Sequence, residues 1–202
     1  MIIIVDYGIS NIGSVKNALD YLGYKSKISN TNLEIKKATK LIIPGSGSFG
    51  EGIKLLKKLK LLDTLNELVL NKKIPILGIC LGYQLMFEYS EEDPKFKGLG
   101  WIKGKVLKFK RRKKFTVPHV GWNRILFNNM KLAKSIPNNS RFYFDHSFFT
   151  IIKEKNLNCG KTSYIKTFQS VYEKKNIFGC QPHLDKSQKF GLQMLKNFCD
   201  IC

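Results

Sequence analysis

The stretch PILGICLGYQLMF, residues 75–87, places one cysteine between two glycines, directly after a run of apolar residues. A short apolar run that ends at a glycine is typical of a strand buried on both faces of a parallel sheet. Residues 78–82 read G-x-C-x-G, the cysteine version of the nucleophile elbow, a tight strand-to-helix turn with no room for Cβ atoms beside the nucleophile. A free cysteine among Ile and Leu is more often a packing residue. The rest of the chain must therefore decide what Cys80 does.

The pattern of a short apolar strand followed by a helix recurs on the N-terminal side of this turn. β-branched runs at 2–7, 40–45 and 74–79 are interrupted by glycine or a polar turn. Between them, residues 11–23 and 51–73 carry apolar side chains at helical spacing. Strands that alternate with helices predict an α/β fold with a doubly wound, mostly parallel sheet.

After residue 98 the sequence changes to short strand-like runs joined by turns, which predict an antiparallel region added to the sheet. These runs are 104–112, 142–149, 163–168 and 170–181. A final helix is expected over 186–199. We find no repeat and no low-complexity linker, so residues 1–202 are expected to form a single domain.

Composition favours a globular cytoplasmic protein. Of the 202 residues, 43% are hydrophobic, which is enough to bury a core. No run approaches the roughly 18 to 20 apolar residues that span a bilayer, and the first residues, MIIIVDYG, lack the basic start of a secretory signal. Five cysteines at irregular spacing suit a reducing compartment better than a disulfide framework.

The net charge is +20, with one dense basic block, KFKRRKK, at 108–114. Lysines are otherwise spread along the chain and no nucleic-acid-binding motif accompanies them, so we expect no nucleic-acid partner. The block is interpreted as a solvated face, or as a docking surface for an acidic partner or a phosphorylated substrate. No histidine pair has ligand spacing and no paired C-x-x-C motif is present, so no metal or cofactor is expected.

A thiol nucleophile needs a base, and the chain offers three histidines. His183 precedes Asp185 by two residues, and in an extended segment such positions point to the same side, so Asp185 is placed to hold and polarise the imidazole. His146 directly follows Asp145, and adjacent strand residues face opposite ways, which makes this pair a weaker candidate. His119 lies in VPHVGWN, where a turn or surface role is expected.

An oxyanion beside Cys80 would need amide donors. The amide of Leu81 and the positive end of the following helix are expected to stabilise a thiolate and then an oxyanion. The stretch PGSG, residues 44–47, closes another predicted parallel strand, and ligand sites gather at the carboxyl ends of such strands. Its glycine-rich backbone would present an amide to the oxyanion, unless it is a plain turn before the next helix.

Together these motifs resemble those of the class I, or triad, glutamine amidotransferases. The order is P-G-x-G at 44–47, G-x-C-x-G-x-Q at 78–84 and H-x-D at 183–185. Within this family the chain is similar to the glutaminase subunits of imidazole glycerol phosphate synthase. That likeness runs nearly end to end, through VDYGISNIGSV, LIIPGSGSFGEG, GLGWI, VPHVGWN, FYFDHS and GCQPHLDKSQKFG.

The resemblance implies a set of catalytic roles. Cys80 attacks the carboxamide of glutamine, giving a glutamyl thioester and ammonia, while His183 shuttles the proton and Asp185 orients it. The amides of Gly47 and Leu81 are the implied oxyanion donors. The part that binds glutamine is implied to be Gln84, with backbone near Ser147 and Phe148.

The resemblance also implies a partner. Ammonia would pass to a separate (β/α)₈-barrel synthase subunit, in a heterodimer that makes imidazole glycerol phosphate and an aminoimidazole carboxamide ribotide in histidine biosynthesis. The residues whose motifs resemble the docking face are Asn11, His119, Gly121 and Trp122.

The chain departs from the family pattern at three places. The usual Q-F-H-P-E is here QPHLD, residues 181–185. Asp185 therefore has an arm one methylene shorter than Glu, and Pro182 removes an N–H just before the base. Asp145 replaces an apolar residue and is expected to add a charge near the site. Two alternatives stay open: a paralogue that supplies ammonia for amination of a bacterial surface sugar, and a docking subunit whose triad has lost its activity.

Overall fold

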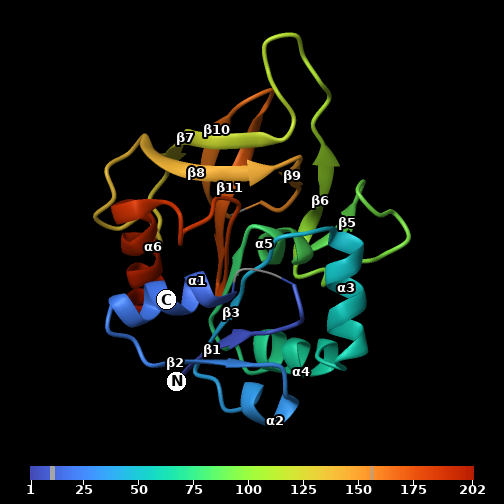
Figure 1. The fold of residues 1–202 in the computed structure, drawn as a ribbon, viewed down its shortest axis with the longest axis vertical. Helices are drawn as coiled ribbons and strands as arrows, with labels where there is room; N and C mark the ends of the chain where they lie inside the picture. Colours follow the sequence, from blue (N-terminus) through green and yellow to red (C-terminus); the bar gives the residue numbers. More distant parts are fainter. Residues whose placement is uncertain (10–11, 156) are drawn as a thin grey trace.

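One large sheet runs through the molecule (Figure 1). The structure is a computed structural model, and it describes residues 1–9, 12–155 and 157–202. Within these residues nine strands pair in the order β2-β1-β3-β4-β12-β11-β10-β7-β8. The parallel part consists of β2 (Ser26–Ser29), β1 (Ile2–Val5), β3 (Lys40–Ile43), β4 (Ile76–Ile79) and β12 (Ile177–Cys180). The remaining strands pair antiparallel: β11 (Thr167–Lys174), β10 (Asn158–Ser163), β7 (His119–Phe127) and β8 (Ser140–His146). The predicted fold class, a mostly parallel sheet with an added antiparallel region, is confirmed.

A smaller sheet of three strands lies beside this antiparallel part. It pairs β6 (Ile102–Lys108) with β5 (Phe87–Ser90) on one side and with β9 (Phe148–Ile152) on the other. Because β8 and β9 are separated by Ser147 alone, the chain passes from one sheet to the other at that residue.

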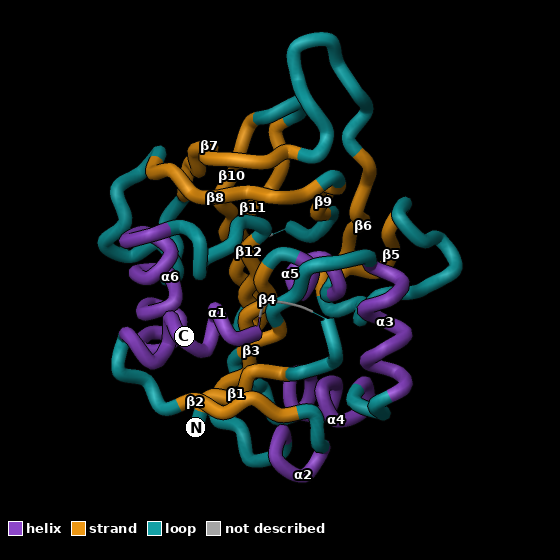
Figure 2. Tube along the Cα trace, in the orientation of Figure 1, coloured by secondary structure: helices purple, strands orange, loops and turns teal. Residues whose placement is uncertain are grey.

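Helices cover both faces of the parallel strands, as Figure 2 shows. Helices α1 (Ile12–Tyr21) and α6 (Gln188–Ile201) pack on one face, and α2 (Asn32–Ile35), α3 (Phe49–Lys58), α4 (Leu62–Asn66), a π-helical turn (Glu67–Asn71) and α5 (Leu81–Leu85) on the other. Strand β1 shows the pattern: Ile2 and Ile4 join the first core, and Ile3 and Val5 the second. Alternation across a strand buried on both sides explains the continuous apolar runs in the sequence.

The single helix predicted over 51–73 is wrong, because the chain breaks between α3 and α4. Lys60 has φ +55°, the amide of Lys60 donates to Lys57 O at 2.9 Å, and the amide of Leu61 donates to Leu56 O at 3.0 Å. This is a Schellman end, with lysine where glycine is usual. The turn brings Leu61 and Leu65 back into the same core as Leu56, which a straight helix would carry away from the sheet.

The strand predicted over 163–168 is also wrong. Strand β10 ends at Ser163 and β11 begins at Thr167, and these two residues pair with each other. Tyr164, Ile165 and Lys166 therefore form the loop of a hairpin, in which the amide of Tyr164 donates to Lys166 O at 3.1 Å. Ile165 is buried under this loop, so an apolar residue here reflects packing rather than a strand. Among the helices of the described residues, none combines the length and the apolar character that a membrane crossing needs.

Candidate active site

Cys80 lies on a strained turn between β4 and α5. Its backbone has φ +53° and ψ −105°, a sparsely populated conformation that costs about 1–3 kcal/mol for a residue with a side chain. The amide of Cys80 donates to Cys180 O on the neighbouring strand at 2.9 Å. A Cβ at Gly78 would lie 2.7 Å from Gly82 O, and one at Gly82 would overlap Ile43 O. Both glycines are therefore required by the close approach of backbone around the turn.

The helix after Cys80 gives less support than the sequence suggested. Helix α5 has five residues, so few aligned peptide dipoles stand behind the turn. The amide of Leu81 donates to Gly45 O at 3.2 Å. Gly47 has φ +136°, a conformation that favours glycine, and it lines the same cavity as this turn.

His183 is backed by Asp185. The amide of His183 donates to Tyr143 O at 2.9 Å, which fixes the backbone of His183 against β8. After His183 the chain turns rather than staying extended, yet Nδ1 of His183 lies 3.7 Å from Oδ1 of Asp185, and both side chains are buried. Burial opposes a charged imidazole, but Asp185 and the sulfur of Cys80 outweigh it and raise the pKa of His183 to about 10.

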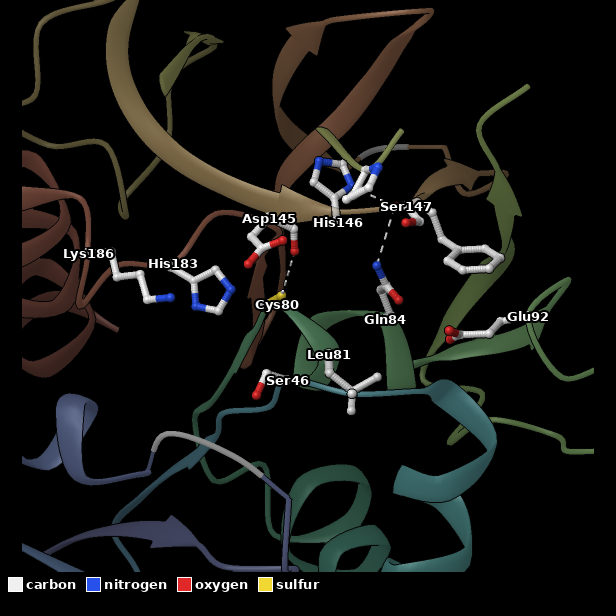
Figure 3. Close-up of a pocket in the computed structure, with 13 residues that line it drawn as sticks. Ser46, Cys80, Leu81, Gln84, Glu92, Asp145, His146, Ser147, His183 and Lys186 are labelled. Atoms are coloured by element: carbon white, nitrogen blue, oxygen red, sulfur yellow. Dashed lines mark hydrogen bonds between the residues drawn. The ribbon is translucent and has the colours of Figure 1, made fainter. Parts of the chain in front are cut away.

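A cavity of about 380 Å³ brings most of the predicted site residues together (Figure 3). From the predictions it collects Gly47, Cys80, Leu81, Gln84, Ser147, Phe148 and His183. The other residues in its wall are Ser46, Glu92, Pro118, Asp145, His146 and Lys186. Asp185 lies outside this wall and reaches the site through His183.

Gln181 is a site residue that the sequence reasoning missed. Its side chain is fully buried, and its Nε2 donates to the Sγ of Cys80 at 3.8 Å. Its Oε1 accepts from Nε2 of Gln84 at 2.8 Å, and Gln84 also donates to Phe148 O at 3.4 Å. The available signal was its place two residues before His183. These amides connect the sulfur to the far wall of the cavity.

Three charged side chains also border the cavity. Asp145, expected to add a charge near the site, lies there, and its carbonyl accepts a weak bond from Cys80 Sγ at 3.9 Å. Lys186 has its Nζ 5.6 Å from the ring centre of Tyr143. Glu92 accepts the amide of Phe49 at 2.8 Å, and burial raises the pKa of Glu92. Figure 3 shows Lys186 and Glu92 at opposite ends of the cavity.

The predicted docking residues divide into three groups. Asn11 lies outside the described residues. Gly121 and Trp122 lie on β7, where Trp122 is 39% exposed and borders a hollow of about 280 Å³. The turn or surface role expected for His119 is wrong: it begins β7, pairs with His146 and is 3% exposed. Gly121 and Asn123 look like turn residues, but pairing with β8 makes them part of a strand.

Within the described residues, no three His, Cys, Asp or Glu side chains gather as a metal ion would need. The fold and site have the arrangement typical of cysteine-nucleophile enzymes: an open α/β sheet with a strained strand-to-helix turn, a histidine beside it and an acid behind the histidine.

Comparison with known proteins identifies the family. The family model "Glutamine amidotransferase class-I" matches residues 3–202. The chain belongs to this family. A protein of Methanococcus maripaludis named imidazole glycerol phosphate synthase subunit HisH 2 is 47% identical over 98% of both chains. A protein of the same name from Pseudomonas aeruginosa is 40% identical over the full length of both.

Solved structures agree in fold. A crystal structure of a glutamine amidotransferase superposes with a TM-score of 0.76 at 13% identity, covering 98% of this chain and 97% of that one. A putative GMP synthase protein from Thermoplasma acidophilum superposes with a TM-score of 0.74 at 20% identity, covering 100% of this chain and 92% of that one. At these identities the likeness concerns the fold alone.

Proposed function

We propose that this chain is the glutaminase subunit of an imidazole glycerol phosphate synthase, active in histidine biosynthesis. The observation that carries this assignment is the full-length identity of 47% and 40% to proteins named as subunits of that synthase. The glutaminase chemistry is supported by the cavity, which joins Cys80 on its strained turn with His183 and Asp185 behind it. We infer that the chain works in the cytoplasm, in a heterodimer with a (β/α)₈-barrel synthase subunit.

In the proposed reaction the sulfur of Cys80 attacks the carboxamide carbon of glutamine. His183, charged when Cys80 is a thiolate, gives its proton to the leaving nitrogen, so the C–N bond breaks, ammonia departs and a glutamyl thioester remains. His183 then takes a proton from water as that water attacks the thioester, which releases glutamate and restores the thiol–imidazole pair. Asp185 holds the ring through Nδ1.

The oxyanion of each tetrahedral intermediate requires amide donors, for which we propose Leu81 and Gly47. The amide of Leu81 donates to Gly45 O at 3.2 Å, so it must exchange this acceptor for the oxyanion. Gly47 lies two residues further along the same strand-following loop, at φ +136°. We expect the loop to rearrange when the partner binds, so the isolated chain should hydrolyse glutamine slowly.

Glutamine carries an ammonium and a carboxylate on its α-carbon, at the end of the molecule away from the carboxamide that reacts. We propose that Gln84, with the backbone of Ser147 and Phe148, binds the substrate near the Glu92 end. Glu92 there suits the ammonium group.

The partner is proposed to dock on the face that carries Gly121 and Trp122. A half-exposed tryptophan beside a hollow is a common interface anchor. His119 is excluded from direct docking because it is buried. Asn11, whose motif also resembles the docking face of the family, lies outside the described residues.

Reconstitution tests the assignment. The chain is mixed with a candidate synthase subunit, and imidazole glycerol phosphate is measured with glutamine or with ammonium salt as the nitrogen source. Product with both sources supports the proposal. A complex that uses ammonia but not glutamine, together with no labelling of Cys80 by a glutamine-analogue electrophile, would instead support a docking subunit without an active triad.

The alternative of a sugar-aminating paralogue is favoured by one observation. Methanococcus maripaludis contributes two relatives, HisH 2 at 47% and HisH 1 at 40% identity, so two such chains coexist in one organism. Glutamine hydrolysis stimulated by a sugar-modifying barrel partner, and not by the histidine-pathway one, would select that alternative.

A further inference from the structure

Two buried histidines that the proposed chemistry does not use face each other across β7 and β8: His119 at the start of β7, and His146 at the end of β8, where it lines the cavity. Nδ1 of His119 is 2.9 Å from Nε2 of His146. Nδ1 of His146 is 2.6 Å from Phe148 O, which is a pure acceptor. Nδ1 of His146 must therefore carry the proton. Burial lowers the pKa of His119 to about 4 and that of His146 to about 3, so both rings are neutral at physiological pH.

These contacts determine the tautomer of each ring. Because neutral His146 has its proton on Nδ1, its Nε2 is a bare acceptor, and the facing Nδ1 of His119 must donate. The Nε2 of His119 is then also a bare acceptor. It lies 3.1 Å from Nδ2 of Asn123, which donates. Every bond in this chain consequently points the same way, from Asn123 through His119 and His146 to Phe148.

The hydrogen-bond chain is anchored at its outer end, at Asn123. The amide of Arg124 donates to Oδ1 of Asn123 at 2.7 Å, and Nδ2 of Asn123 also donates to Ser163 O at 3.0 Å. These bonds orient the side-chain amide of Asn123 so that Nδ2 faces His119. The His119 ring is held between the rings of Phe144 and Tyr164, at centroid distances of 4.8 and 3.9 Å.

The inner end of the chain is the wall of the cavity. Phe148 O accepts from His146 and, at 3.4 Å, from Gln84, whose amide also donates to Gln181. Gln181 in turn donates to the sulfur of Cys80. Figure 3 shows His146, Ser147 and Gln84 meeting on this side of the cavity. The Phe148 carbonyl is thus the point where the histidine chain joins the amides that reach the nucleophile.

We propose that Asn123, His119 and His146 are positioning residues, whose one-directional hydrogen bonds fix the Phe148 carbonyl at the wall of the cavity and thereby set its affinity for glutamine. The identity of the ligand rests on the proposed function. The chain acts through a backbone oxygen, so these side chains contribute to substrate binding more than to the rate of the chemical step.

The first test measures the tautomers directly. In the wild-type protein labelled with ¹⁵N-histidine, the proposal predicts that His119 and His146 each carry one proton, on Nδ1, at pH 7. An Nε2 proton on either ring, or two protons on one ring, overturns it. This readout does not depend on glutamine or on activity.

The second test uses two substitutions of His146 in a chain that binds but cannot turn over glutamine. In the Cys80→Ala background, His146→Leu removes the donor to Phe148 O, whereas His146→Asn places an amide N–H near the position of Nδ1. Loss of one hydrogen bond corresponds to roughly a three- to tenfold larger dissociation constant for glutamine. We expect that loss by calorimetry for His146→Leu, and recovery to within about twofold for His146→Asn.

Matching circular dichroism spectra and melting curves confirm that both variants fold. Equal loss in both variants, or no loss in either, overturns the positioning role. If the Cys80→Ala parent binds no glutamine, the proposed function fails, and the role of the hydrogen-bond chain in glutamine binding fails with it. The tautomers still decide whether the hydrogen-bond chain exists. The Leu126→Ala variant, at an exposed position of β7, the strand that carries His119, is the control and should bind as the parent does.

Discussion

The Nδ1 atom of His183 lies 3.7 Å from the Oδ1 atom of Asp185, just beyond a hydrogen bond. The shorter arm of aspartate explains this gap, because the segment after His183 turns and the carboxylate must reach back to the ring. The pair is nonetheless close enough for the carboxylate to stabilise a protonated imidazole. Two predictions depend on this pair.

The first concerns the length of the acidic arm. Asp185→Ala should reduce glutamine turnover roughly a hundredfold less than Cys80→Ala or His183→Ala, because orientation is a smaller contribution than nucleophilicity or proton transfer. Asp185→Glu should retain most activity, since the added methylene can close the gap. Steady-state glutaminase rates of the partner-bound variants check both. Equal losses for Asp185→Ala and His183→Ala would contradict the orienting role.

The second concerns pH and stability. The pKa of His183 is raised from 6.5 to about 10, so the folded state binds a proton that the unfolded state releases. The contribution of protonated His183 to the free energy of unfolding is complete below pH 6.5 and disappears as the pH rises to about 10. Urea unfolding of wild type and His183→Gln should therefore show a stability difference that shrinks between these limits. A difference that is constant or grows with pH would argue against the charged pair.

A third prediction concerns the buried amide beside the sulfur. Gln181→Leu should destabilise the protein by about 1–3 kcal/mol, because the amide of Gln84 loses its buried acceptor, and should lower glutamine turnover about tenfold through loss of the bond to Cys80. The control is Gln193→Leu on α6, whose amide bonds Asn197 away from the cavity. Loss of activity in the control of the same size would remove the special role of Gln181.

A fourth prediction concerns the strained turn. Gly82→Ala should destabilise the fold strongly, because its Cβ would overlap the backbone carbonyl of Ile43. Gly13→Ala is the matched control: Gly13 is exposed near the start of α1 and has nothing within 4 Å of the added methyl group. It should be neutral, or stabilising by up to about 1 kcal/mol. Similar melting temperatures for both variants would contradict the close packing at the turn.

A fifth prediction concerns the partner. Trp122→Ala should leave the isolated chain folded, because the side chain is 39% exposed, and should weaken the complex by about 2 kcal/mol if it anchors the interface. Calorimetric titration of the barrel subunit measures this. Tyr21→Ala, a more exposed aromatic at the end of α1, serves as the control. Unchanged affinity in the Trp122 variant would remove this residue from the interface.

Local patterns were sufficient to predict three of the parallel strands, β1, β3 and β4, and the turn at Cys80. Each of these features has a signal in adjacent residues of the sequence: an apolar run for each strand, and the flanking glycines for the cysteine. The turn at Lys60 was not predictable in this way, because a lysine with positive φ has no local signal and the break follows from the need to return leucines to the core.

The features that sequence reasoning missed depend on distant pairing. His119 is buried because β7 pairs with β8, and that pairing places it opposite His146. Gln181 acquires its role because β12 lies beside β4, which brings it to the sulfur of Cys80. No spacing within either segment reports such contacts. The short strand β2 and helix α2 were missed for a simpler reason, since each has four residues and a mixed polar composition.

The central claim is that Cys80 and His183 release the ammonia that a partner subunit consumes. It is tested most directly by measuring product formation in the reconstituted complex with glutamine and, separately, with ammonium salt. For Cys80→Ala and His183→Ala the account predicts loss of glutamine-dependent product and wild-type levels of ammonia-dependent product. Glutamine-dependent product that persists in the Cys80→Ala complex, with normal partner binding, would contradict it.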